Sequence, residues 1–304
     1  MKRILISMAL ALGIAGTVGA SWAVLSVSDE AGQPSGISVS LDGSDRRNEA
    51  VAEYELRNDP RVRAFVQAYE ALVDSVAYGK EDVVFFLGSR PIHFQDGRML
   101  EEGSLDRRED CDPIFYRYPL GTLTEIPSLR EENPTYCTDL QESLWGTTDA
   151  QIREHGGSTR FLDHRLFVNN LVIDALAAVE TDLLEVAKGD RSVASWIDDL
   201  DITYSFVDRE IAGSPTRSNH AWGMAVDLVP DSYDGQDVYW QWSRVYNKDE
   251  WHQIPLERRW SPPGAVIEIF ERHGFVWGGK WAHFDNIHFE YRPEILLYNQ
   301  LISS

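Results

Sequence analysis

Apolar positions recur every three or four residues in three stretches of the chain, which is the spacing of an amphipathic helix. The first predicted helix covers residues 59–79, where Asp59 supplies an N-cap and Pro60 occupies the first helical position. The second covers residues 166–186, and the third ends at residue 274 after starting behind a Ser-Pro-Pro sequence at 261–263. We therefore expect three helices separated by segments of a different character.

Shorter apolar runs predict strands, and in several of them apolar and polar positions alternate. Because helices lie before and between these strands, the pattern indicates an α+β fold with a small, mostly antiparallel sheet and flanking helices. The predicted strands cover residues 83–87, 202–207, 224–228, 275–279 and 287–291.

Two stretches show neither the helical spacing of apolar residues nor the alternation of a strand. Residues 28–58 are rich in Ser, Gly, Asp and Glu, and we expect a flexible linker there. Residues 88–157 combine Gly, Pro and charged residues with few periodic apolar positions. A structureless loop of that length is uncommon inside a domain, so we interpret this stretch as an insertion. The predicted domain covers residues 59–304, and its motif-bearing core lies at about 160–295.

The composition is that of a folded, strongly acidic protein. The chain has 304 residues, of which 28 are basic and 49 acidic, so its net charge is −21 with neutral histidines. Such a chain repels phosphate backbones, which argues against nucleic-acid binding. The excess of acidic residues otherwise favours solubility and says little about function.

The N-terminus has the pattern of an export signal. Lys2 and Arg3 precede an uncharged, largely apolar run at residues 4–27, with small residues that favour cleavage after Ala20 or Ala23. The same run is long enough to span a bilayer if it stays uncleaved. We expect an exported protein of the periplasm or cell envelope, and residues 1–27 as either a signal peptide or an inner-membrane anchor.

The chain contains two cysteines, Cys111 and Cys137. In an exported protein such a pair favours a disulfide, which here would close a loop of about 25 residues and contribute roughly 3 kcal/mol. This bond would pin the predicted insertion. The alternative is two free buried thiols. Neither cysteine has a second cysteine or a histidine close by, so we do not expect them to bind zinc.

The candidate chemistry begins at residues 218–227, where His220 and Asp227 flank Gly223. On a regular strand the odd spacing would place His220 and Asp227 on opposite faces. A turn at Gly223 removes that conflict, because His220 can then project from a loop while Asp227 shares a strand face with the small Ala225. Both side chains can therefore reach one metal ion.

A second stretch, at residues 283–290, supplies further groups. His288 and Glu290 share one strand face, and Asp285 lies across a turn before them. Catalytic zinc takes imidazole nitrogen and carboxylate oxygen and keeps one position open for water. Three ligands, one water and one uncoordinated carboxylate would make a hydrolase.

Several nearby residues have more than one interpretation. Ser218 orients the loop or a ligand, and it has no base positioned to make it a nucleophile. His283 either hydrogen-bonds the substrate or a ligand, or is a plain turn histidine. Glu290 either supports the site electrostatically or faces solvent. The tryptophan-rich segment at 240–260 forms either a lip that stacks on the substrate or a hairpin that buries its own aromatic rings.

The two motifs resemble a known family. Ser218-x-His220-x-x-Gly223-x-Ala225-x-Asp227 is similar to the first zinc motif of the D-alanyl-D-alanine metallopeptidases, which include VanX- and VanY-like enzymes and phage L-alanyl-D-glutamate endolysins. Asp285-x-x-His288-Phe289-Glu290 resembles their second motif, and Trp277-Gly278-Gly279-x-Trp281 resembles the endolysin-like branch. The resemblance covers roughly residues 160–295.

The resemblance implies a fold shared with lysostaphin-like and hedgehog domains. It also implies one zinc ion held by His220, Asp227 and His288, with Asp285 as the general base that passes a proton to the leaving amine. Family members use an arginine in a Gly-Tyr-Arg-Ser segment to hold the substrate, and this chain departs from that pattern. Arg209 is the candidate here, with Arg217 behind it.

The resemblance further implies hydrolysis of a peptide bond next to a D-amino acid in peptidoglycan stem peptides or crosslinks. We also expect the protein to be a monomer. Carboxypeptidase and endopeptidase action remain open. The alternative is a zinc-stabilised peptidoglycan-binding module at the cell envelope that has lost its activity.

Overall fold

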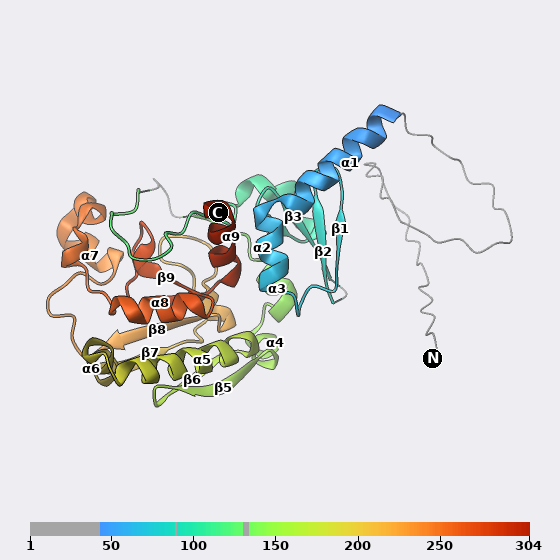
Figure 1. Ribbon diagram of the computed structural model, residues 1–304. Helices are drawn as coiled ribbons and strands as arrows, with labels where there is room; N and C mark the ends of the chain where they lie inside the picture. Colours follow the sequence, from blue (N-terminus) through green and yellow to red (C-terminus); the bar gives the residue numbers. More distant parts are fainter. Residues whose placement is uncertain (1–42, 89, 130–133) are drawn as a thin grey trace, which may run out of the picture.

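The computed structural model of the protein describes residues 43–88, 90–129 and 134–304 (Figure 1). The predicted signal peptide or anchor at residues 1–27 lies outside the described residues, as does the predicted linker up to residue 42. No helix in the described part of the chain is both long enough and apolar enough to cross a membrane.

A four-stranded antiparallel sheet lies at the centre of the C-terminal half, with the strand order β7-β8-β10-β9. The sequence predicted a strand at each of these places, with ends that differ by up to three residues. The bounds are Leu200–Tyr204 for β7, Ala225–Pro230 for β8, Phe275–Trp277 for β9 and His288–Tyr291 for β10. The α+β class is confirmed, whereas the hedgehog-type arrangement stays a prediction.

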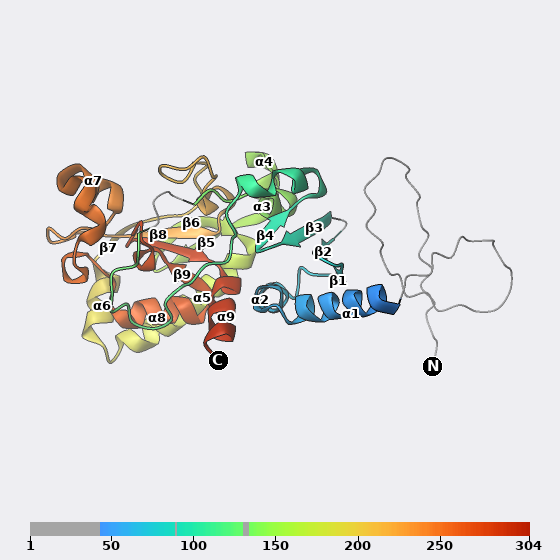
Figure 2. The ribbon, with the colours of Figure 1, turned by 90° about the horizontal axis from the view of Figure 1, so that it is seen from above.

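The helices α5 (Asn170–Ala187), α6 (Arg191–Asp198) and α8 (Gly264–Arg272) lie on one side of this sheet, and the candidate site lies on the opposite face of β8 and β10. The helix α5 begins at the N-cap Asn169, whose side chain accepts from the Leu171 amide, and α6 follows it. Figure 2 shows α5 and α8 on the same side of the strands. They share one core with apolar side chains of the sheet, including Val226, Leu228, Phe275 and Phe289.

A second sheet with the order β1-β2-β3-β4 packs on α2 (Pro60–Ala68), and we call this helix and sheet the N-terminal unit. Its core includes side chains of α9 (Pro293–Ser303), and Figures 1 and 2 both show α2 beside α9. Val276 of β9 belongs to the same core, so the N-terminal unit is packed on the central sheet. The strands are Ser75–Tyr78 (β1), Val83–Leu87 (β2), Arg90–Gln95 (β3) and Arg98–Leu100 (β4).

The prediction of a flexible linker at residues 28–58 is wrong for its last part, because residues Gly43–Asn58 form the helix α1. This segment is rich in Glu, Ala and Arg, which have high helix propensity. An ion pair between Glu53 and Arg57 adds the i,i+4 contact that favours a helix.

The first two predicted helices are also corrected. The first ends at Ala68, and β1 replaces its last turns by pairing with β2. The second begins at Asn170, because residues His164–Asn169 form β6, which pairs with β5 (Gly156–Phe161). Helical spacing was present in both stretches, but strand pairing with a neighbour in sequence overrides it.

The interpretation of residues 88–157 as an insertion is wrong, although the predicted disulfide between Cys111 and Cys137 is confirmed. Its residues Ile92, Phe94 and Met99 lie in the core of the N-terminal unit, so the segment is integral to the fold. The remaining elements of this segment are η1 (Glu102–Asp110), α3 (Asp139–Trp145), α4 (Asp149–Glu154) and the start of β5.

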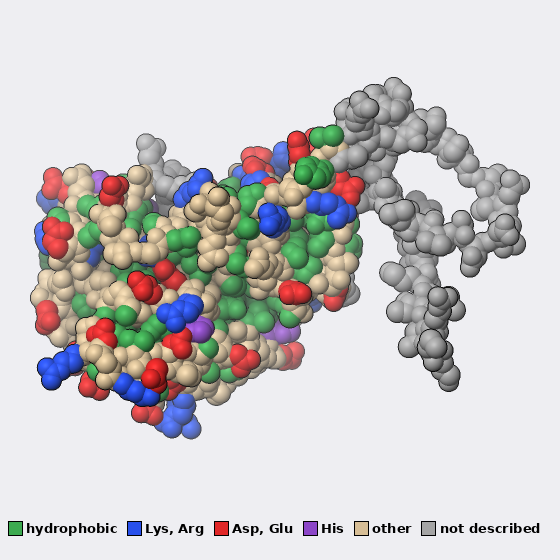
Figure 3. Space-filling model, viewed as in Figure 1, with side chains coloured by type: hydrophobic (Ala, Val, Ile, Leu, Met, Phe, Trp, Pro, Cys, Tyr) green, Lys and Arg blue, Asp and Glu red, His purple; other side chains and the backbone are tan. Residues whose placement is uncertain are grey.

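The tryptophan-rich segment folds into α7 (Trp240–Asn247), η3 (Lys248–Gln253) and η4 (Leu256–Arg258). Trp240 and Trp251 pack with Ile254 and Phe284 in a small separate core, so the segment buries aromatic rings as one interpretation required, but helices replace the predicted hairpin. Trp242 nevertheless stays 53% exposed. On the face in Figure 3, acidic and basic side chains are interspersed, so the acidic excess does not gather in one patch there.

Candidate metal centre

His220 is presented by a short 3-10 helix, η2 (Asn219–Trp222), that connects a loop to β8. The hydroxyl of Ser218 caps this turn by accepting from the His220 amide. Gly223 then adopts a left-handed φ of 68°, and a Cβ at this position would lie 2.7 Å from the Asn169 backbone nitrogen. Only glycine fits both the conformation and the close approach, which confirms the predicted turn.

Asp227 and His288 come from neighbouring strands and lie opposite each other in the β8-β10 register. The predicted alternation is confirmed, since Val226 and Phe289 point to the apolar core while Asp227 and His288 point to the other face. Strand pairing thus places two candidate ligands side by side, and the η2 turn brings His220 onto them.

Three acceptor atoms converge at this point. His220 Nε2 lies 3.1 Å from Asp227 Oδ1 and 3.1 Å from His288 Nδ1, and His288 Nδ1 lies 2.9 Å from Asp227 Oδ1. Ligands bound tetrahedrally to zinc at about 2.0 Å would lie about 3.3 Å apart. The triangle is therefore close to the size that one zinc ion requires.

The outer nitrogen of each imidazole has its own partner. His220 Nδ1 lies 2.5 Å from the Ser205 carbonyl oxygen, which can only accept, so this nitrogen carries the proton. His288 Nε2 donates to Glu290 Oε2 at 3.3 Å. In the neutral imidazoles both inner nitrogens are lone pairs that face Asp227, so either a proton or a metal cation must bind between these three acceptors. Glu290 thus supports the site, as one of its two predicted roles required.

The electrostatics also favour a cation. Burial acts to lower the pKa of His288, but hydrogen bonds to Asp227 and Glu290 more than offset it and raise that pKa to about 10. Burial acts to raise the pKa of Asp227, yet the two imidazoles hold it well below its ordinary value. The carboxylates that stabilise a proton on His288 would stabilise a divalent ion in its place.

Asp285 lies in the turn before β10, where its amide donates to the Gly278 carbonyl at 3.1 Å. Its Oδ1 is buried and has no hydrogen-bond partner in the described structure. Burial first, and then the charge of Asp227, raise the pKa of Asp285 to about 7. A carboxyl group with a pKa near the working pH, beside the ligands and not among them, suits a general base.

Residues 212–291 match the family model for D-alanyl-D-alanine carboxypeptidases. This carboxypeptidase-like segment contains His220, Asp227, Asp285 and His288, so the resemblance inferred from the motifs is confirmed for it. No solved structure matches the chain.

Arg209 lies just outside the carboxypeptidase-like segment, but its side chain extends to Asp227, one of the three candidate ligands. Its Nη2 is 3.9 Å from Asp227 Oδ2, and its side chain is 40% exposed. Arg217, the second candidate, instead pairs with Asp208 at 2.9 Å, donates to the Thr147 carbonyl and packs over the Trp222 ring. Of the two arginines, Arg209 is therefore the one that lies beside a candidate metal ligand, and its role in substrate binding stays a prediction.

His283 lies within the small tryptophan core. Its ring centroid is 4.7 Å from that of Trp240 and 5.0 Å from that of Trp251. Burial, followed by the charge of Arg244, lowers the pKa of His283. These contacts favour the interpretation of a packed turn histidine, and its role in substrate binding stays a prediction.

Sequence reasoning missed two groups beside the site. The Ser205 carbonyl fixes the tautomer of His220, and a backbone oxygen leaves no signal in the sequence. The second group is Tyr239, which directly precedes the tryptophan-rich segment and was not a candidate. It forms an antiparallel bridge with Asp285, and burial together with the Asp285 charge raises its pKa to about 12.

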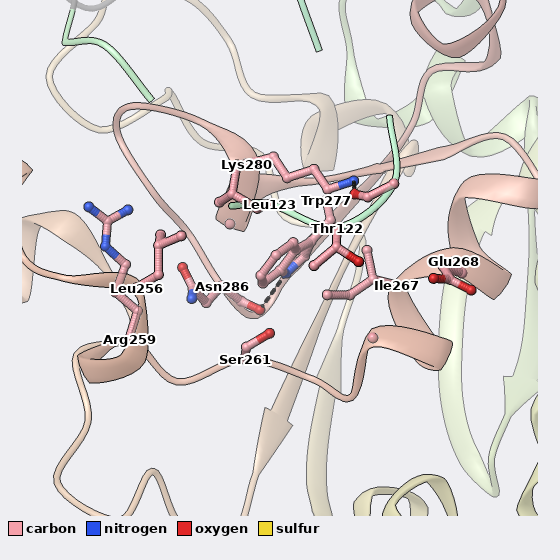
Figure 4. A pocket seen from close by; sticks show the side chains of 13 residues that line it. Thr122, Leu123, Leu256, Arg259, Ser261, Ile267, Glu268, Trp277, Lys280 and Asn286 are labelled. Atoms are coloured by element: carbon pink, nitrogen blue, oxygen red, sulfur yellow. Dashed lines mark hydrogen bonds between the residues drawn. The ribbon is translucent and has the colours of Figure 1, made fainter. Parts of the chain in front are cut away.

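A cavity of about 270 Å³ lies between the loop at residues 121–123, the start of α8 and the Gly278–Lys280 turn (Figure 4). None of the three candidate ligands lines it. Figure 4 shows the indole of Trp277 within it, donating to the Asn286 carbonyl at 2.8 Å. The cavity is thus separate from the metal centre, although Asn286 adjoins Asp285.

Proposed function

We propose that the protein is a zinc-dependent peptidase that hydrolyses a peptide bond next to a D-amino acid in peptidoglycan stem peptides or crosslinks. The observation that carries this proposal is the triangle of His220, Asp227 and His288 with the buried Asp285 beside it. The match of the surrounding segment to D-alanyl-D-alanine carboxypeptidases supports the substrate class. The disulfide and this family similarity support export.

Two imidazoles and one carboxylate are the donor set of a catalytic zinc site, and a bound zinc ion would polarise the scissile carbonyl and acidify a water molecule. His220, Asp227 and His288 would hold the ion, and their outer hydrogen bonds keep the inner nitrogens free for it. Asp285 would take a proton from the attacking water and deliver it to the leaving amine. Arg209 would pair with a carboxylate or carbonyl group of the substrate.

Asp285 favours a peptidase over a silent binding module. A structural zinc site closes its fourth position with a protein ligand and has no use for a free carboxylate. Burying a carboxyl oxygen without a partner costs folding free energy, so its retention is expected where catalysis needs it.

The proposal is tested by incubating the purified protein with muropeptides, with and without a chelator, and identifying the products by mass. We expect cleavage next to a D-amino acid that stops when the metal is removed and returns when zinc is added. Release of a terminal amino acid would identify a carboxypeptidase, and separation of crosslinked peptides an endopeptidase. Tight zinc binding without cleavage of any muropeptide would contradict the proposal and favour the binding module.

A further inference from the structure

Four ionisable residues follow one another at every second position where β10 leads into α9. They are His288, Glu290, Arg292 and Glu294. A spacing of two places His288 and Glu290 on one face of β10, while Arg292 is the N-cap of α9 and Glu294 lies in its first turn. His288, Glu290 and Glu294 are buried, and the Arg292 side chain is only 11% exposed. A row of buried charges needs a complete set of partners.

Each of these side chains contacts the next. His288 Nε2 donates to Glu290 Oε2 at 3.3 Å, and Arg292 Nη1 donates to Glu290 Oε1 at 3.0 Å. Arg292 Nε donates to Glu294 Oε1. One guanidinium thus bridges two carboxylates, and the first of those carboxylates fixes the ring of a candidate metal ligand.

The row ends on the N-terminal unit. The hydroxyl of Tyr69, which directly follows α2, donates to Glu294 Oε2 at 2.8 Å, and both residues are buried. Arg292 Nη2 also donates to the Ile114 carbonyl at 3.1 Å. Two segments outside the carboxypeptidase-like region, at residues 69 and 114, therefore complete the partners of the row.

We propose that Glu290, Arg292, Glu294 and Tyr69 form a buried relay of hydrogen bonds that positions His288 for the metal and makes the N-terminal unit part of the metal centre. Glu290 holds the proton on Nε2 and so keeps Nδ1 free for the ion. Arg292 and Glu294 hold Glu290, and Tyr69 holds Glu294. The relay rests on the proposed metal centre but adds residues that lie outside its motifs.

The relay is tested by measuring zinc Kd for the full chain by competition with a chromophoric chelator, and by recording the visible spectrum of the cobalt-substituted protein. Glu290→Gln should raise the zinc Kd by about 10- to 100-fold, because outer partners of metal-bound histidine have effects of this size. Tyr69→Phe should raise it by about 2- to 30-fold, the range for residues that act through a packed network. Both variants should shift the cobalt spectrum, which reports the ligand field of His288.

The matched control is Tyr298→Phe. Tyr298 packs in the same core as Tyr69, with its ring 5.5 Å from Phe115, but its hydroxyl makes no hydrogen bond in the described structure. This variant should leave the zinc Kd and the cobalt spectrum unchanged. Thermal unfolding of the metal-free proteins separates any general loss of stability from the effect on the metal.

The outcomes separate the two proposals. If Tyr69→Phe and Tyr298→Phe have the same zinc Kd and the same spectrum, the relay to the N-terminal unit is wrong while the metal centre stands. If Glu290→Gln leaves both measurements unchanged, the positioning role is wrong from its first step. If the wild-type chain binds neither zinc nor cobalt, the proposed function fails and the relay with it.

Discussion

The two faces of the central sheet differ sharply, although the same strands supply both. On β8 and β10 the residues Val226 and Phe289 point into an apolar core with α5 and α8, and their neighbours Asp227 and His288 point to the opposite face. That face buries several ionisable groups within contact of one another. The apolar face contributes folding free energy by removing surface from water, whereas the polar face costs it unless a cation is bound. Substitutions on the polar face should therefore reduce zinc binding and activity, whereas substitutions on the apolar face should reduce folding stability.

The largest effect is expected on the polar face from His288→Ala. Loss of one of three ligands should reduce hydrolysis of muropeptides to the background rate and abolish stoichiometric zinc binding. The apolar core is untouched, so the far-ultraviolet circular dichroism should remain that of a folded protein. His273→Ala is the control, because His273 pairs with Asp182 away from the ligands. Retained activity in the His288→Ala variant would show that His288 is not a metal ligand.

The next effect is expected from Asp285→Asn, which keeps the shape of the side chain but removes the base. We expect kcat to fall by about 10²- to 10⁴-fold, the usual contribution of general acid–base catalysis, with the zinc content unchanged. Asp198→Asn, at an exposed position of α6, should retain full activity. Loss of zinc together with activity in Asp285→Asn would show that Asp285 is a ligand and not a base.

Phe289→Ala tests the apolar face. The ring of Phe289 is fully buried and stacks on Phe270 at a centroid distance of 4.1 Å. Truncation should lower the free energy of unfolding by about 3–5 kcal/mol, as measured by denaturant titration. Below the unfolding transition the variant should still bind zinc. A Phe289→Ala protein with wild-type stability would contradict the assignment of this face as the main core.

A smaller effect is expected from pH on the stability of the metal-free protein. The pKa of Asp285 is raised from 3.8 to about 7 and that of His288 from 6.5 to about 10, so in both cases the folded state binds its proton more tightly than the unfolded state. Stability should therefore fall as pH rises, through Asp285 between about 4 and 7 and through His288 between about 6.5 and 10.

Thermal unfolding of the metal-free protein across this pH range measures how steeply its stability changes with pH. Asp285→Asn should remove the part below pH 7, and zinc should remove the part due to His288 because the ion replaces the proton. Metal-free stability that increases steadily from pH 4 to 10 would mean that neither pKa is raised.

The ligands were predictable because their pattern is local. Alternation on β10 and a glycine turn before β8 are both visible in the sequence, and strand pairing then places Asp227 opposite His288. The N-terminal unit was not predictable in the same way. Its strand β3 buries His93 as well as Ile92 and Phe94, so no clear alternation marks it. The segment is ordered by packing on α2 and α9, which come from opposite ends of the chain.

The alternation of His288, Glu290, Arg292 and Glu294 was also visible, but its meaning depends on Tyr69, 225 positions from Glu294. The hydrogen bond from His220 to the Ser205 carbonyl depends on backbone geometry alone. Contacts of these two kinds require the folded chain, because neither spacing nor residue type specifies the partner.

The central claim is that the polar face of β8 and β10 holds one catalytic zinc ion. It is tested most directly by titrating the metal-free protein with zinc while following the rate of muropeptide hydrolysis. We predict no hydrolysis without metal and a linear rise in rate that reaches its plateau at one zinc ion per chain. Full activity in the metal-free protein, or zinc bound at one ion per chain without any hydrolysis, would contradict this account.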